Sequence, residues 1–141
     1  MPSYSFGYSY ILAYIGALLA FCAMDFLWLT IVAKSFYQKN MGMLMLAEPN
    51  LVPAAFFYLL YILGLLVFAV IPAIRSQSFI MALSLGAFLG LIAYASYDLT
   101  NLATLKGWTV ILSTVDIGWG IVVSAVASGA GFMAARIFAK V

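Results

Sequence analysis

Three aspartates stand inside long apolar stretches of this chain. Asp25, Asp98 and Asp116 are three of its four acidic residues, and only Glu48 lies in a more polar segment. If those stretches cross a membrane, a charged carboxylate at the bilayer centre costs about 2.5–3.5 kcal/mol on insertion scales, so such a residue is a functional candidate by default. Because the chain has no histidine, carboxylate chemistry is the chemistry to explain.

No basic residue lies close to these aspartates along the sequence. Lys34 and Lys106 are each roughly 12–14 Å along a helix from the nearest one, and their side chains would extend toward water. Unpaired carboxylates must be protonated or must hold a cation. Ligands that offer only oxygen favour Mg²⁺, Mn²⁺ or Ca²⁺ over zinc or copper. Nearby aromatic side chains could instead wall a cationic headgroup by cation–π contact; these are Trp28, Trp119, Tyr94 and Tyr97.

The aspartates also have a purely structural interpretation. Buried carboxylates can accept hydrogen bonds from tryptophan and tyrosine across a helical bundle, and so fix the register of its helices. We therefore keep two roles open for Asp25, Asp98 and Asp116, namely cation ligands or acid–base groups, and structural acceptors.

Composition places these residues in a membrane. The chain has 141 residues, enough for one domain, and it is 67% hydrophobic and only 7% charged, against about 25% charged in a typical soluble domain. A soluble fold needs more charged residues than this on its water-exposed surface. We therefore expect lipid to cover most of the surface of this chain. The net charge of +2 gives no basic field for nucleic acid.

Four apolar stretches are each long enough to span about 30 Å of hydrocarbon. The sequence predicts an all-α membrane protein with one domain over residues 1–141, a bundle of four transmembrane helices at about 8–33, 52–73, 79–105 and 109–138. Residues 1–10 lack the positive region of a signal peptide, so we expect the first helix to be retained. Lys106, Gly107 and Trp108 predict a tight turn with an interfacial aromatic.

The predicted depth of the aspartates is shared. Asp25 and Asp98 lie about five or six residues past the middle of their helices, and Asp116 about five before the middle of a helix that runs the opposite way. At ~1.5 Å per residue, all three lie roughly 8 Å from the midplane on one side. We expect one common site, in which Tyr97 joins the aspartates as a reacting group and Asn101 positions the substrate.

The longest loop, residues 34–51, faces the same side of the membrane. Its apolar residues predict a short amphipathic lid or a connector in the headgroup region; they are Met41, Met43, Leu44, Met45 and Leu46. Charge does not set the orientation, because each side carries three basic residues. Lys34, Lys39 and Lys106 lie on one side, and Arg75, Arg136 and Lys140 on the other. The terminal amine tips the balance toward cytoplasmic termini.

Small residues recur at helical spacing in the last two helices. Gly86 and Gly90 form one pair, and Gly120, Ser124 and Ser128 repeat the pattern. Such stripes allow helix backbones to approach closely in lipid, either within the bundle or at a homodimer interface.

Several segments resemble a known family of bacterial membrane proteins. The longest is Tyr97–Trp108, and the others are Asp25–Trp28, Phe36–Tyr37, Pro49–Asn50 and Asp116–Gly120. Together they resemble the family catalogued as domain of unknown function 2177, over nearly the whole chain. The resemblance implies a four-helix protein of the bacterial inner membrane and brings no assigned activity. Thr109 departs from the proline expected after Trp108.

Three functions fit these observations. The first is a cation-dependent site that binds or modifies a lipid or another hydrophobic small molecule, in which Tyr94, Trp28, Trp119 and Asn101 contact the ligand. The second is a small proton- or cation-coupled transporter, a dimer. The third is a non-catalytic assembly or scaffold protein. Whether the protein is an enzyme stays open, because no nucleophile motif, phosphate loop or cofactor fingerprint is present.

Overall fold

Helices make up nearly all of the described chain. The computed structural model describes residues 4–139, with side chains from residue 7 onward, and it contains no strand among them. Lys140, one of the basic residues predicted on the terminal side, and residues 1–3 lie outside the described part. Four helical segments are long and apolar enough to cross a membrane, at Gly7–Met41, Leu51–Arg75, Phe79–Thr104 and Val110–Ala139. The predicted all-α fold class is confirmed.

The first two segments each contain a π-helical turn. The first consists of α1 (Tyr4–Leu27), η1 (Trp28–Val32) and α2 (Ala33–Met41), and the second of α3 (Leu51–Leu65), η2 (Leu66–Val70) and α4 (Ile71–Arg75). The last two are the unbroken helices α5 (Phe79–Thr104) and α6 (Val110–Ala139). In η1 the Thr30 hydroxyl donates to the carbonyl oxygen of Phe26 at 2.7 Å, a back-bond that often accompanies a distorted helix.

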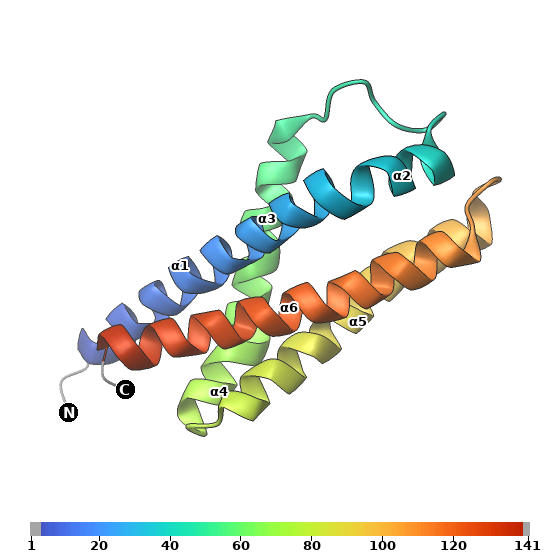
Figure 1. Ribbon diagram of the computed structural model, residues 1–141. Helices are drawn as coiled ribbons and strands as arrows, with labels where there is room; N and C mark the ends of the chain where they lie inside the picture. The colour runs from blue at the N-terminus through green and yellow to red at the C-terminus, as the bar shows by residue number, and fades with distance from the viewer. Residues whose placement is uncertain (1–3, 140–141) are drawn as a thin grey trace.

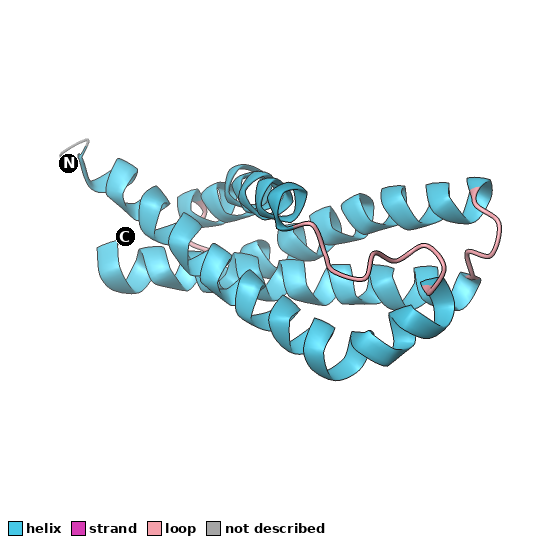
Figure 2. Cartoon of the chain, turned by 90° about the horizontal axis from the view of Figure 1, so that it is seen from above, coloured by secondary structure: helices cyan, strands magenta, loops and turns pink. Residues whose placement is uncertain are grey.

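The α6 helix holds the bundle together. It packs along α5 on one side and along α1 on the other, and Figure 1 shows α1, α5 and α6 running in similar directions while α3 and α4 cross them. Figure 2 shows α3 nearly end-on, with the 42–50 loop passing from it to the end of α2. The second segment meets α5 through η2 and α4, so α3 diverges from α5 toward the loop end.

Polar side chains start three of the helices. Asn50 accepts from the Val52 amide at 3.1 Å, Ser78 from the Met81 amide at 3.2 Å, and Thr109 from the Leu112 amide at 3.2 Å. Each bond satisfies one of the free N–H groups of a helix N-terminus. Thr109, the departure from the family pattern, is therefore the N-cap of α6. Gly107 has φ +81°, which allows the tight turn between α5 and α6.

The small residues of α5 and α6 pack against each other inside the bundle. A side chain at Gly86 would collide with Ser128 and with the carbonyl oxygen of Ser124, and one at Gly90 with the carbonyl oxygen of Gly120. The predicted close approach is thus an intramolecular one between these two helices.

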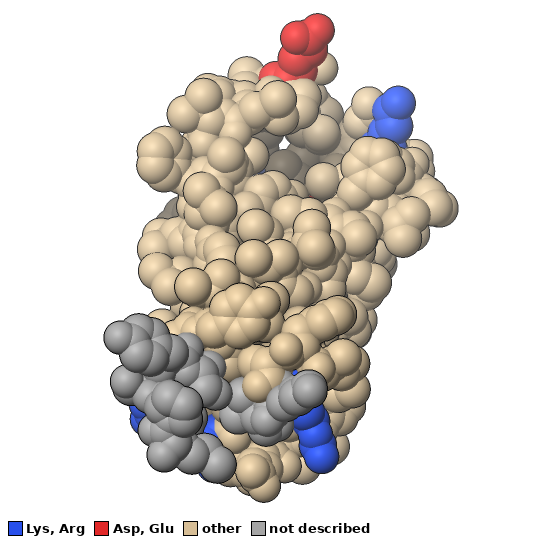
Figure 3. Space-filling model, turned by 90° about the vertical axis from the view of Figure 1, so that its left-hand side faces the viewer, with Lys and Arg blue, Asp and Glu red and all other residues tan. Residues whose placement is uncertain are grey.

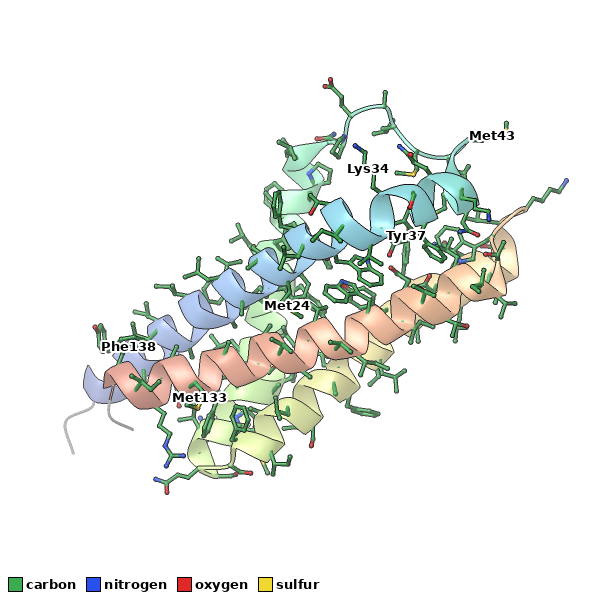
Figure 4. The ribbon with its side chains drawn as sticks, viewed as in Figure 1. Met24, Lys34, Tyr37, Met43, Met133 and Phe138 are labelled. Carbon is green, nitrogen blue, oxygen red and sulfur yellow. The ribbon has the colours of Figure 1, made fainter. Side chains whose placement is uncertain are left out.

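The first helical segment extends eight residues beyond the end predicted for it. We expected a loop from Lys34, but α2 continues to Met41. The polar residues of this stretch suggested a loop, yet it contains no proline or glycine before Gly42, so nothing in it stops a helix. The extension matters because it carries Tyr37 toward α6 (Figure 4).

Candidate functional site

All three intramembrane aspartates line one cavity of about 280 Å³ near the loop end of the bundle. Asp25 comes from α1, Asp98 from α5 and Asp116 from α6. Six of the thirteen lining residues are aromatic: Trp28, Tyr37, Tyr94, Tyr97, Trp108 and Trp119. Leu29, Leu112, Met41 and Met45 complete the wall. Among the described residues that line the cavity, none is a lysine or arginine, so the walls carry acidic groups and no basic ones.

The 42–50 loop covers the cavity only in part. Met45 of this loop lines it, as does Met41 at the end of α2. Met43, Leu44 and Leu46 do not line it, and Met45 is itself 44% exposed. Figure 4 shows Met43 close to the end of α2. Lys34 points away from α6 in the same view. In Figure 3 a hollow is visible beneath the upper end of the molecule, and the visible Lys, Arg, Asp and Glu lie toward the two ends of the face.

Asp25 is held by two donors from other helices. The Tyr58 hydroxyl of α3 donates to Asp25 Oδ2, and Trp119 Nε1 of α6 donates to Asp25 Oδ1 at 3.2 Å. These bonds tie α1 to α3 and to α6. They match the structural interpretation of a buried aspartate, an acceptor that fixes how the helices meet.

Asp116 belongs to a second chain of bonds. The Tyr37 hydroxyl of α2 donates to Asp116 Oδ1 and accepts from Trp28 Nε1 at 3.4 Å. Trp28 in turn stacks on Trp119, with ring centroids 4.4 Å apart and planes 6° from parallel. Through this stack the Asp25 and Asp116 systems form one continuous wall between the first helical segment and α6.

Asp98 differs from the other two. Its side chain is fully buried, and within the described structure neither carboxylate oxygen has a hydrogen-bond partner. The group that interacts with it is the carboxyl of Asp116. Two acidic groups facing each other out of water either share a proton or require a cation between them. Asp98 and Ser128 are the described residues whose buried side-chain atoms lack a hydrogen-bond partner, and of the two Asp98 lines the cavity.

Hydrogen bonds from neighbouring residues fix the backbone of Asp98 beside the cavity. Trp108 Nε1 donates to Ser113 Oγ at 2.9 Å, and the Ser113 hydroxyl donates to the backbone carbonyl oxygen of Asp98 at 3.4 Å. We expected Trp108 in a tight turn as an interfacial aromatic; it lies in the turn before α6, and 9% of its surface is exposed. The turn folds its ring inward, where it meets Tyr97 edge-on at 5.8 Å between centroids.

The remaining predicted residues divide into two groups. Tyr94, Tyr97, Trp28 and Trp119 line the cavity. Asn101 is not among its lining residues; its side chain instead interacts with Tyr97 on the next turn of α5. Among the described residues, no three His, Cys, Asp or Glu side chains are grouped so that they could hold a metal ion. The aspartates thus share a cavity without forming a three-carboxylate cage, and a metal role remains a prediction.

Two tyrosines at the site were missed by the sequence reasoning. Tyr37 lies in the stretch read as a loop, and Tyr58 is one of many aromatic residues in an apolar helix. The Phe36–Tyr37 pair in the family resemblance was the available signal for Tyr37. The spacing of Tyr58 and Tyr61 places both on one side of α3, where Tyr61 reaches Ser124 of α6 at 2.7 Å.

Comparison with known protein families identifies the family of this chain. Residues 10–133 match the family described as Predicted membrane protein (DUF2177). The chain belongs to this family. No curated protein and no solved structure matches it. The DUF2177 description states a membrane protein, in agreement with the four apolar helices, and the matched range contains every residue that lines the acidic cavity.

Proposed function

We propose that this DUF2177 protein binds the protonated amine of a hydrophobic molecule in its acidic cavity. The observation that carries the proposal is Asp98, which is fully buried and has two carboxylate oxygens without a donor. A primary ammonium supplies three N–H donors and a positive charge. Such a group would satisfy Asp98 and would also remove the repulsion between Asp98 and Asp116.

The rest of the wall supports a cation of this kind. The aromatic side chains around the carboxyls can each add about 0.5–2 kcal/mol of cation–π attraction. The site lies between apolar, membrane-spanning helices, and the inner membrane that the family resemblance implies would deliver ligands with an apolar part. A metal ion is less well matched, since the described carboxyls do not converge as a set of three.

Binding also fits the position of the cavity better than transport does. The cavity occupies the loop end of the bundle, while buried apolar side chains such as Ala13, Val70 and Ala73 pack against one another in the opposite half. In a transporter, those side chains would have to move apart to open a path to the other side of the membrane. A binding or modifying site needs access from one side only.

A fluorescence titration tests the proposal. The chain has three tryptophans, and all three line the cavity, so their emission reports on its occupancy. Detergent-purified protein is titrated with propylammonium, and we expect a saturable change. Asp98→Asn should weaken binding about tenfold or more, because a hydrogen bond to a charged group contributes about 1.5–3 kcal/mol. The matched control is Glu48→Gln, the same carboxyl-to-amide change on an exposed loop residue, and it should bind as wild type does.

Other ligands separate this proposal from its rivals. Tetramethylammonium has the charge without N–H donors, so it should bind more weakly than propylammonium. If Mg²⁺, Mn²⁺ or Ca²⁺ gives a saturable response that EDTA reverses, and propylammonium gives none, the cavity binds a metal ion and not an amine. Equal binding of propylammonium by wild type and Asp98→Asn would refute the role given to Asp98.

A further inference from the structure

A second cavity adjoins the acidic one on the flank of the bundle. It has a volume of about 340 Å³ and is lined by Phe57, Ala93, Tyr94, Tyr97 and Asp116. Three of these residues, Tyr94, Tyr97 and Asp116, also line the acidic cavity. The two spaces therefore share a wall, at which a carboxyl group is present.

The helices explain why this groove exists. Phe57 belongs to α3, Ala93, Tyr94 and Tyr97 belong to α5, and Asp116 belongs to α6. Because the second helical segment meets α5 through η2 and α4, the upper part of α3 leaves a space beside α5. Phe57 and Tyr97, on the two sides of this space, are 46% and 56% exposed. In a chain surrounded by lipid, such a groove opens toward the hydrocarbon.

We infer that this groove holds the hydrocarbon chain of the ligand whose amine occupies the acidic cavity. The inference rests on the proposed function and adds a substrate class, a long-chain amine that reaches the site from the membrane between α3 and α5. Its basis is adjacency, since the two cavities have three lining residues in common. A molecule that passes between those side chains has its charged end beside Asp98 and Asp116 and its apolar end between Phe57 and Ala93. The acidic cavity cannot hold a long hydrocarbon tail as well, because the tail would then lie against the carboxyl groups.

Filling the groove while leaving the acidic cavity open tests the inference. Ala93 lines the groove but not the acidic cavity, so Ala93→Leu narrows one space and not the other. Ala103→Leu is the matched control, the same change on the same helix at an exposed position that lines neither. Two ligands are titrated against the tryptophan signal in the same detergent, propylammonium without a tail and dodecylammonium with one. Partition of the tail into the micelle is common to all variants and cancels in the comparison.

We expect Ala93→Leu to bind propylammonium within about twofold of wild type and dodecylammonium about tenfold more weakly or worse, a loss worth about 1.4 kcal/mol at the least. Ala103→Leu should bind both as wild type does. If Ala93→Leu does not fold, Phe57→Trp narrows the groove from the α3 side. Because it adds a fourth tryptophan, its binding and that of wild type are measured by isothermal titration calorimetry, and the same pattern is expected.

Two failures can be told apart. If propylammonium binds in an Asp98-dependent way but Ala93→Leu binds dodecylammonium normally, the groove is not the tail site and the proposed function stands. Equal losses in Ala93→Leu and Ala103→Leu would also overturn the groove. If neither ammonium binds the wild type, the proposed function itself is wrong.

Discussion

The half of the bundle near the chain termini and the half near the loops 42–50 and 105–109 differ in how their helices meet. In the terminal half, α5 and α6 touch through Gly86, Ser124 and Ser128, and α6 meets α1 where Gly131 lies against Ala13. In the loop half the same helices carry aspartates and large rings around a cavity. Close packing of small residues joins the helices of the terminal half, where the cavity beside Gln77 and Arg136 has only about 70 Å³, whereas larger polar residues in the loop half surround about 280 Å³.

Among the described residues, each half has one buried side chain without a hydrogen-bond partner, Ser128 in the terminal half and Asp98 in the loop half, and of these two only Asp98 carries a carboxyl. Asp25 and Asp116, in the loop half, accept bonds that cross between helices, yet Asp98 beside them accepts none within the described structure. A group left unsatisfied in this way lowers stability and is retained where a function requires it. The comparison therefore predicts that the terminal half responds to changes in volume and the loop half to changes in hydrogen bonding.

The largest expected effect is on the packed half. Gly86→Ala places a methyl group against Ser128 and 2.7 Å from the carbonyl oxygen of Ser124. We expect a loss of about 3 kcal/mol in unfolding free energy, the upper end of the usual cost of overpacking, measured by thermal unfolding in detergent. Gly64→Ala is the matched control, because a side chain there would meet nothing within 4 Å. It should be neutral or more stable by up to about 1 kcal/mol. Equal stability of the two variants would contradict the close contact of α5 with α6.

The next effect separates two aspartates of the loop half. Asp25→Ala leaves the Tyr58 hydroxyl and Trp119 Nε1 without their acceptor, and we expect it to cost about 2 kcal/mol, since an unsatisfied donor costs about 1–3 kcal/mol. Asp98→Ala removes a side chain whose oxygens no described group contacts by a hydrogen bond. It should be as stable as wild type or more stable in the absence of ligand, and it should lose propylammonium binding. A loss as large as that of Asp25→Ala would mean that Asp98 has a structural partner.

These differences show where sequence reasoning succeeds. The four helices and the level of the aspartates follow from hydropathy and from the rise of a helix, which are properties of one segment at a time. The sequence therefore predicts one common depth for Asp25, Asp98 and Asp116, and the structure places all three around one cavity.

What could not be predicted depends on rotation about the helix axes and on contacts between segments. The π-helical turn at Trp28–Val32 changes the direction of every side chain after it in the first helical segment, and Tyr37 meets Asp116 only because α2 continues past Lys34. Tyr58 meets Asp25 only because α3 crosses α1. For the same reason Asn101, which shares a helix face with Tyr97, lies outside the cavity that Tyr97 lines.

The smallest expected effect is at Tyr37, which links Asp116 to the stacked rings through Trp28. Tyr37→Phe removes the hydroxyl that donates to Asp116 and accepts from Trp28, while it keeps the ring that lines the cavity. We expect a loss of about 1 kcal/mol, the usual net contribution of a hydrogen bond, measured by thermal unfolding. Tyr8→Phe, the same change on an exposed residue of α1, should have no effect. Because Asp116 then lacks its donor, ammonium binding in Tyr37→Phe should hold steady or tighten. If binding is lost while stability is unchanged, the Tyr37 hydroxyl contacts the ligand itself. Its role would then be to bind the ligand directly and not to hold Asp116 in place.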